Sequence, residues 1–367
     1  MLDNAEEKEW LYRIAFTFID KAGPKLIRKF LENYDDVESI FKEKPSELRA
    51  ITGIPHIVLR SLLNNDRKEE LLKRAEKELN FIIKNKMDIL WVTDKDYPER
   101  LKACPDAPPI LYSKGDMNLS RERMISIVGT RKSTRYGEDL CDKIIEQLSE
   151  KNVTIVSGLA YGIDIKAHRA ALNNNMQTIS ILPHGLDIIY PAPHKKEVKK
   201  MIENGGILTE FSTGSFGNKE NFPRRNRIIA GISDATLVVE SAEKGGALIT
   251  ADIAHSYNRD VLATPGKVND PRSAGCNKLI KTQKAALVEN AEDIAYQMNW
   301  DERSKHLSKQ KELFIEVSEK EKTIVKEMGS EAVHVDILSV KTGKSMRELS
   351  TILLQLEMKG VIRSLPG

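Results

Sequence analysis

Short apolar runs alternate with amphipathic helical patterns between about residues 85 and 300, and this alternation constrains the fold more than any other feature. Apolar residues at helical spacing, as in Leu140, Ile144 and Leu148, separate the runs from one another. The runs predicted as buried strands are Ile125–Val128, Val153–Val156, Thr178–Leu182, Ile207–Leu208, Ala235–Val239 and Val261–Ala263. Such alternation is typical of a parallel sheet that helices cover on both faces. We therefore predict an α/β fold with a Rossmann-like, doubly wound, mostly parallel sheet.

A helical block precedes this region. Apolar residues recur at helical spacing in residues 1–84, and tight turns are expected at residues 22–25 and 52–55. Both turns resemble the hairpins of SAM or helix-hairpin-helix domains, in which backbone N–H groups at a helix start hold a phosphate. Pro24 and Pro55 each remove one such donor, which is a departure from that pattern. The alternative is a plain helical bundle.

The chain closes with a second small helical unit. Residues 301–311 are polar and charged and are predicted to be a linker between the sheet domain, 85–300, and a C-terminal domain, 312–367. The turn at residues 342–345 precedes a helix through Leu349 and Leu356, an arrangement that resembles a winged helix. In such folds the second helix can enter a major groove of DNA, and the face here would carry Lys341, Lys344 and Arg347. The alternative is a module for protein contact or for structure alone.

Composition narrows the class of protein. The 367 residues carry a net charge of only +3, so any case for nucleic acid depends on local patches. The cysteines at 104, 141 and 276 are too far apart for a C-x-x-C pair, which favours a reducing cytosol. The acidic N-terminus lacks the apolar segment of a signal peptide, and no apolar run is long enough to span a membrane. We therefore expect a cytoplasmic protein.

The loops that follow the predicted strands carry the residues best suited to binding an anion. In an open parallel sheet, ligands bind beyond the carboxyl ends of the strands. Arginine suits phosphate, glycine lets a ligand approach the backbone closely, and an aromatic ring next to arginines offers a surface on which a base can stack. The candidate binding residues are Gly129, Thr130, Arg131, Ser157, Gly158, Lys195, Phe222, Arg224, Arg225, Asn226, Arg227, Gly245 and Gly246.

No catalytic constellation accompanies these loops. Ser157 has no neighbouring base, and His168 falls within a predicted helix, where we expect it to be a hydrogen-bonded structural residue. His184 and His194 lack a carboxylate or cysteine at ligand spacing, so we expect no metal. Gly343-Lys344-Ser345 imitates the end of a phosphate-binding loop, but Leu338 stands where its first glycine belongs. We expect a protein that is not an enzyme and that uses no cofactor.

Taken together, the ordered motifs resemble one family, DprA, the DNA-processing protein A family. They are Val128-Gly-Thr-Arg131, Ser157-Gly-Leu-Ala-x-Gly-Ile-Asp164, Gly185-Leu-Asp-x-x-Tyr-Pro191, Phe222-Pro-x-Arg-Asn-Arg-Ile-Ile-Ala-Gly231, Val238-Val-Glu240 and Pro265-Gly266. The resemblance covers about residues 90–295. It implies a homodimer that binds single-stranded DNA without sequence preference, protects it during natural transformation and helps to load the RecA recombinase. It also implies that Arg131 contacts phosphate and that Phe222, Arg224, Asn226 and Arg227 belong to a strand-binding segment. Because both stretches follow strand ends, we expect them to form one DNA groove.

Three departures and two alternatives accompany the resemblance. His184 stands where a small residue is usual, Pro193-His194 stands where a lysine often serves DNA, and Gly245-Gly246-Ala247 lacks the usual Ser-Gly-Ser hydroxyls. Lys195 or Lys196 is expected to replace the missing lysine. One alternative function is a nucleotide-binding enzyme of the phosphoribohydrolase type, although the glutamate of its Gly-Gly-x-Gly-Thr-x-x-Glu helix start is missing. The other, an NAD oxidoreductase, lacks its fingerprint glycines.

Overall fold

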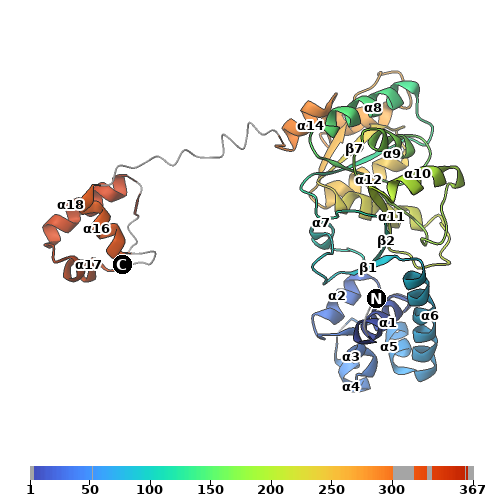
Figure 1. Cartoon of the computed structure of the whole chain (residues 1–367), viewed down its shortest axis with the longest axis horizontal. Coiled ribbons are helices and arrows are strands. Elements are labelled where there is room, and N and C mark those ends of the chain that lie inside the picture. Colours follow the sequence, from blue (N-terminus) through green and yellow to red (C-terminus); the bar gives the residue numbers. More distant parts are fainter. Residues whose placement is uncertain (1–3, 52, 301–317, 329–332, 360, 363–367) are drawn as a thin grey trace. The chain divides into compact units, whose positions relative to one another are not determined.

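The computed structural model describes residues 4–51, 53–300, 318–328, 333–359 and 361–362 (Figure 1). The chain divides into two compact units, Met1–Trp300 and Asp301–Gly367. The linker predicted at 301–311 lies outside the described residues, and the boundary predicted between residues 84 and 85 stays a prediction. No helix in the described part of the chain is long and apolar enough to cross a membrane.

A nine-stranded sheet forms the centre of the first unit, in the order β1-β2-β6-β5-β4-β3-β7-β8-β9. The strands are β1 (Asp88–Trp91), β2 (Ile110–Lys114), β3 (Met124–Gly129), β4 (Thr154–Ser157), β5 (Thr178–Ile181), β6 (Gly205–Thr209), β7 (Ala235–Glu240), β8 (Asp260–Ala263) and β9 (Ala286–Leu287). Strands β3 to β9 pair in parallel, whereas β2 pairs antiparallel with both β1 and β6. The strand order reverses between β3 and β7, which is the topological switch point of a doubly wound sheet.

Alternate side chains of each strand enter the two helical layers. Ile125 and Ile127 of β3 join the core under α8 (Arg135–Ser149), α9 (Ile163–Asn173) and α14 (Ala291–Gln297). Met124 and Val128 point to the other face, under α7 (Glu99–Lys102), α11 (Asn221–Ile232), α12 (Gly246–Ser256) and α13 (Ala274–Lys281). The remaining cover is a 3-10 turn, η1 (Ala192–His194), followed by α10 (Lys195–Met201). Because both faces are buried, the central strands combine apolar residues with small buried hydroxyl side chains such as Ser126, Thr178 and Ser180.

The predicted α/β fold is confirmed, with two differences in detail. All six predicted strands are present, as β3 to β8, with ends shifted by up to two residues. Strands β1, β2 and β9 were not predicted. Residues 221–231 were predicted to be a loop, and this is wrong, because they form most of α11. Pro223 is compatible with that helix because it lies in the first turn, where a backbone N–H has no partner within the helix.

Six helices precede the sheet and pack on its β1–β2 side (Figure 1). They are α1 (Asn4–Thr17), α2 (Pro24–Leu31), α3 (Val37–Lys42), α4 (Pro45–Ala50), α5 (His56–Leu63) and α6 (Asn65–Lys84). Phe16 and Phe30 meet edge to face in their core, with ring centroids 5.3 Å apart. Trp91 and Tyr112, from the two antiparallel strands, belong to the same buried cluster. The helical region is therefore held against the sheet by a shared apolar core.

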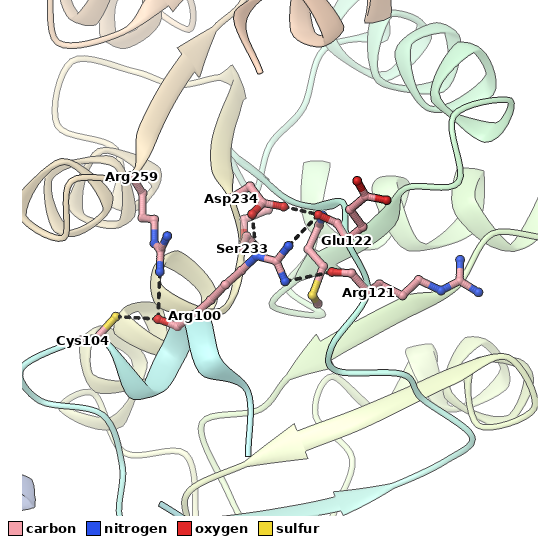
Figure 2. Close-up of polar contacts among 9 residues, drawn as sticks. Arg100, Cys104, Arg121, Glu122, Ser233, Asp234 and Arg259 are labelled. Atoms are coloured by element: carbon pink, nitrogen blue, oxygen red, sulfur yellow. Dashed lines mark hydrogen bonds and ion pairs between the residues drawn. The ribbon is translucent and has the colours of Figure 1, made fainter. Parts of the chain in front are cut away.

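The amino ends of the central strands are closed by a polar network that Arg100 of α7 organises (Figure 2). Its guanidinium donates to Asp234 Oδ1 at 2.5 Å and to the carbonyl oxygens of Arg121 and Glu122 at 2.8 and 2.6 Å. Arg259 in turn donates to the Arg100 carbonyl at 2.8 Å. Because these guanidinium groups donate to acceptors of the protein itself, we assign this edge of the sheet a structural role. In an open α/β sheet, a ligand site is expected at the opposite edge, where the carboxyl ends of the parallel strands lie.

The second unit contains α16 (Glu319–Met328), α17 (Val335–Thr342) and α18 (Met346–Met358). Ile324, Leu338 and Leu349 are buried in its small core. Gly343 has a left-handed backbone (φ 64°), which lets the chain turn sharply from α17 into α18. Ser345 then caps α18 in a reciprocal capping box with Glu348. The predicted pair of helices around residues 342–345 is therefore confirmed.

Candidate nucleic-acid interface

Hydrogen bonds tie the loops at the carboxyl ends of the central strands to one another. Thr130 N–H, after β3, donates to the carbonyl of Glu240 at the end of β7, at 2.7 Å. Ile163 N–H, at the start of α9, donates to the Thr130 carbonyl at 3.2 Å. The first contact lies at the switch point, and the second joins the connections that follow β3 and β4. The loops therefore form one continuous surface, which we call the carboxyl edge and define by residues 129–136, 157–162, 185–195, 210–224 and 240–246.

The buried Glu240 side chain fixes the loop between β3 and α8 by a hydrogen bond. Thr134 N–H donates to Glu240 Oε2 at 2.8 Å, and the Thr134 hydroxyl caps α8 by accepting from Gly137 N–H at 3.1 Å. Gly129 closes the strand where a Cβ would lie 2.5 Å from Ile163 Cγ1, so no side chain fits there. These contacts fix the backbone on both sides of Arg131 while its own side chain stays exposed.

Arg131 lies over the ring of Phe222 at the surface of this edge. The guanidinium carbon is 5.3 Å from the ring centroid, within the range of a cation–π contact. Arg131 comes from the loop after β3, and Phe222 from the first turn of α11. The structure thus brings together two predicted site residues that are far apart in the sequence. The pair offers a phosphate-binding cation next to an aromatic face.

Arg225 is buried, unlike its neighbour Arg131. Its side chain donates to the carbonyl oxygens of Gly158 at 2.6 Å and Ile181 at 2.5 Å, and the residue is only 4% exposed. Gly158 is required here, because a Cβ would lie 2.1 Å from the Arg225 Nη1 atom. Burial lowers the pKa of Arg225 to about 10, against the opposing effect of the Asp164 carboxylate, so the group stays charged at neutral pH. Its predicted contact with a ligand stays a prediction.

Asp164 is the buried acid that faces this cation. Burial raises its pKa, whereas Arg225 and the backbone N–H groups of Ala160 and Gly158 lower it. Ser157, another predicted site residue, donates its hydroxyl to the Ile127 carbonyl at 2.6 Å and is fully buried. The end of β4 therefore contributes internal structure beneath the surface, with its side chains turned away from solvent.

The other arginines of α11 surround Glu210. Arg227 is buried and donates to Glu210 Oε2 at 2.5 Å, whereas the Arg224 side chain is 57% exposed and lies 3.4 Å from the same oxygen. Arg224 also lies over the ring of Phe211, 5.1 Å from its centroid. Asn226 is half-buried and accepts from Arg225 Nε at 3.2 Å. Of the three arginines predicted in this segment, Arg224 is the one that faces solvent.

The remaining predicted residues lie along the same edge. Lys195 is exposed at the first position of α10. Gly245 caps α12, and the exposed Gly246 begins it. His184 and His194 each lie with Nδ1 within 2.9 Å of a backbone carbonyl oxygen, that of Gly185 and of Leu159 respectively. No cluster of His, Cys, Asp and Glu that could hold a metal occurs among the residues described.

Four exposed aromatic residues at this edge were missed by sequence reasoning. They follow β3, β4, β5 and β6 in turn, and their exposed fractions are 56% for Tyr136, 48% for Tyr161, 57% for Tyr190 and 69% for Phe216. Tyr161 is steadied by an edge contact with the His194 ring, at 5.0 Å between centroids. Tyr136 lies in the first turn of α8 and the other three between a buried strand and the next helix, and large aromatic side chains in such connections were the available signal. They add stacking surfaces to the edge.

An open α/β sheet with exposed arginines and aromatic rings at its switch point defines a Rossmann-like protein with an anion-binding carboxyl edge. Residues 88–299 match the family model described as DNA recombination-mediator protein A, and residues 313–367 match the DprA winged helix domain. The chain belongs to the DNA recombination-mediator protein A family, as its sequence motifs predicted. The first unit is its mostly parallel sheet with an N-terminal helical region, and the second is its winged-helix domain.

Relatives agree with this assignment over most of the chain. Protein Smf of Escherichia coli K12 is 34% identical over 316 residues, which are 81% of this chain and 83% of the relative. The structure of DNA processing protein A from Streptococcus pneumoniae matches with a TM-score of 0.64 and 30% identity, over 80% of this chain and 98% of that one. A structure of DNA processing protein A from Helicobacter pylori, which concerns its single-stranded DNA binding mode, matches with a TM-score of 0.53 and 28% identity. It covers 58% of this chain and 95% of that one.

Proposed function

We propose that this protein binds single-stranded DNA, without sequence preference, at the carboxyl edge. The observation that carries the proposal is the exposed Arg131 guanidinium over the Phe222 ring at the switch point. An arginine can neutralise a phosphate while an adjacent ring stacks with a base, and every base has a π-face. Tyr136 and Tyr161 extend this surface with further exposed rings. The Helicobacter pylori relative supports the same ligand class.

We further propose that the protein acts as a homodimer that protects the strand and loads the RecA recombinase, without catalysing a reaction itself. Membership of a recombination-mediator family supports this role. The chemistry of the edge agrees with it. The Ser157 hydroxyl is used inside the sheet, and His168 is buried against Thr178 at the amino end of β5, so neither is offered to a ligand. Reversible binding of a DNA strand requires cations for the phosphates and aromatic rings for the bases, and the carboxyl edge supplies both.

The salt dependence of binding tests the proposal. If the edge contacts about three to five phosphates, the logarithm of the binding constant for oligo-dT should fall against the logarithm of salt concentration with a slope of roughly −2 to −3.5. The measurement is a fluorescence-anisotropy titration between roughly 50 and 200 mM salt, with a matched duplex as the control. We expect weaker binding to the duplex, whose stacked bases cannot lie on the exposed rings. A flat salt response, or no binding, would argue for a nucleotide-handling enzyme instead.

A further inference from the structure

A cleft lies between the N-terminal helical region and the carboxyl end of β6. Its volume is about 550 Å³, and its lining includes Phe18, Lys21, Arg74, Phe211 and Arg224. We call it the N-terminal cleft. It lies next to the Arg131–Phe222 pair, because Arg224 and Phe222 both belong to the first turn of α11. The volume falls within the range of protein pockets that hold ligands.

The cleft repeats the chemistry of the carboxyl edge. Arg224 lies over Phe211 at 5.1 Å, and Arg74 of α6 lies over Phe18 at 3.9 Å from the ring centroid. Together with Arg131 over Phe222, this makes three arginine–aromatic pairs, of which two line the cleft and two include a residue from the first turn of α11. A repeated unit of cation and ring suits a polymer of phosphates and bases better than a single small molecule.

The charge of the cleft favours an anionic ligand. Lys21 and Arg74 are exposed on its helical side, and Arg224 on the sheet side. Glu210 also lines it, but this carboxylate is paired with the buried Arg227 at 2.5 Å as well as with Arg224. The remaining acidic group is Asp20, which is exposed next to Lys21. The cations therefore outweigh the free carboxylates.

Both walls of the cleft are held in place. Glu78 of α6 is buried and accepts from Thr213 N–H, in the loop after β6, at 2.9 Å. The Thr213 hydroxyl donates to the same carboxylate. This contact fixes the helix that carries Arg74 against the loop that carries Phe211. A ligand would therefore meet a cleft that is already formed, at little cost in ordering.

We propose that the N-terminal cleft receives nucleotides of the same single strand that the carboxyl edge binds. The DNA path then continues from Arg131 across Arg224 to Arg74. The inference rests on the proposed function, because it extends that site onto the helical region. It assigns to α6 and to the turn between α1 and α2 a direct part in holding DNA. The length of the DNA strand distinguishes the two cases, because only a long strand can reach from the carboxyl edge into the N-terminal cleft.

The test compares oligo-dT of about six nucleotides with oligo-dT of about 25, by anisotropy, for wild type and the double variant Lys21→Gly/Arg74→Met. Lys21 has a left-handed backbone (φ 63°), which glycine adopts without strain, and methionine keeps an apolar stem over Phe18. We expect the variant to bind the long strand about tenfold more weakly, with a salt slope shallower by about 1.4, and to bind the short strand as wild type does. Thermal unfolding should be unchanged.

Two controls separate this inference from the proposed function. Lys25→Ala/Lys84→Ala removes the same charge from α2 and α6 outside the cleft lining and should bind both strands as wild type does. Arg131→Ala should weaken binding of both lengths. If wild type binds both strands and the cleft variant binds the long one equally well, the inference is overturned and the proposed function stands. Equal losses for short and long strands would also overturn it. If wild type binds neither, both fail.

Discussion

Arg225→Ala should lower the free energy of unfolding by roughly 3–5 kcal/mol, although it removes an arginine from a segment rich in basic residues. The guanidinium is buried and donates to the carbonyls of Gly158 and Ile181. Its loss leaves two buried acceptors without a donor, a cavity under the edge, and Asp164 without its nearby cation. Thermal or urea unfolding measures the effect, and the melting temperature should fall by roughly 10 °C.

Arg224→Ala is the matched control, one residue earlier on the same helix. Its side chain is mostly exposed, and Glu210 keeps Arg227 as a partner when Arg224 is removed. We therefore expect its stability to change by less than about 0.5 kcal/mol. Gly158→Ala should reproduce the loss from the other side, because its Cβ would occupy the place of the Arg225 guanidinium. A stable Arg225→Ala protein with weakened DNA binding would show that Arg225 turns outward to the ligand.

Acidification should destabilise the protein through His168. This side chain is fully buried, and its Nδ1 lies 2.7 Å from the Thr178 hydroxyl oxygen. That hydroxyl donates to the Ile155 carbonyl at 3.0 Å, so Thr178 accepts and His168 Nδ1 carries the proton. The other ring nitrogen, Nε2, is buried without a hydrogen-bond partner among the described residues. Protonation at Nε2 would therefore bury a charge with nothing to accept its hydrogen.

The direction of the pH effect follows from the pKa. Burial, helped by His194 and Arg225, lowers the pKa of His168 from 6.5 to about 3. Below about pH 6.5, His168 therefore binds a proton in the unfolded chain but stays neutral in the folded protein. The free energy of unfolding decreases as the pH falls from there toward 3. At about 1.4 kcal/mol for each pH unit, the loss between pH 6.5 and 4 should be roughly 3 kcal/mol.

His168→Asn isolates this contribution, because asparagine keeps a donor near Thr178 but does not titrate. The raised pKa values of Asp164 and Glu78 act in the opposite direction in both proteins, so the comparison between them removes that effect. We expect a flatter dependence of unfolding free energy on pH for the variant. His255→Asn changes an exposed histidine of α12 and should keep the wild-type dependence. Equal slopes for His168→Asn and wild type would contradict the assignment.

The sheet could be predicted because its central strands are buried on both faces. Continuous apolar runs such as Ile125–Val128, set between amphipathic helices, are typical of strands in a parallel sheet. Strand β1 gave no such signal, because it begins with the exposed Asp88 and pairs at an edge. Strand β9 spans only Ala286–Leu287, too short for any pattern. Edge strands depend on their neighbours more than on their own residues.

The site was predictable in location but less so in detail. The residues that follow the predicted strands correctly indicated the carboxyl edge. The neighbouring Arg224 and Arg225, however, lie in opposite environments, because the first is exposed and the second is buried. Arg225 shares helical spacing with the buried Ile228, Ile229 and Ile232, so its burial follows once the segment is read as a helix. The cation–ring pairs, in contrast, each join a helix residue to a residue of another segment, and only the folded chain brings the two together. Because both stretches follow strand ends, the sequence predicts that the Arg131 loop and the Phe222–Arg227 segment share one groove, but no spacing predicts that the Arg131 guanidinium lies over the Phe222 ring.

Removing the two exposed arginines, Arg131 and Arg224, tests whether single-stranded DNA binds at the carboxyl edge. The measurement is an anisotropy titration of oligo-dT of about 25 nucleotides with wild type, Arg131→Ala/Arg224→Ala, and the control Arg121→Ala/Lys284→Ala. The control removes two cations that precede β3 and β9, at the amino ends of the strands. We expect the first variant to lose at least about tenfold in affinity while keeping its stability, and the control to bind as wild type does. Equal affinity of all three proteins would contradict a DNA site at the carboxyl edge.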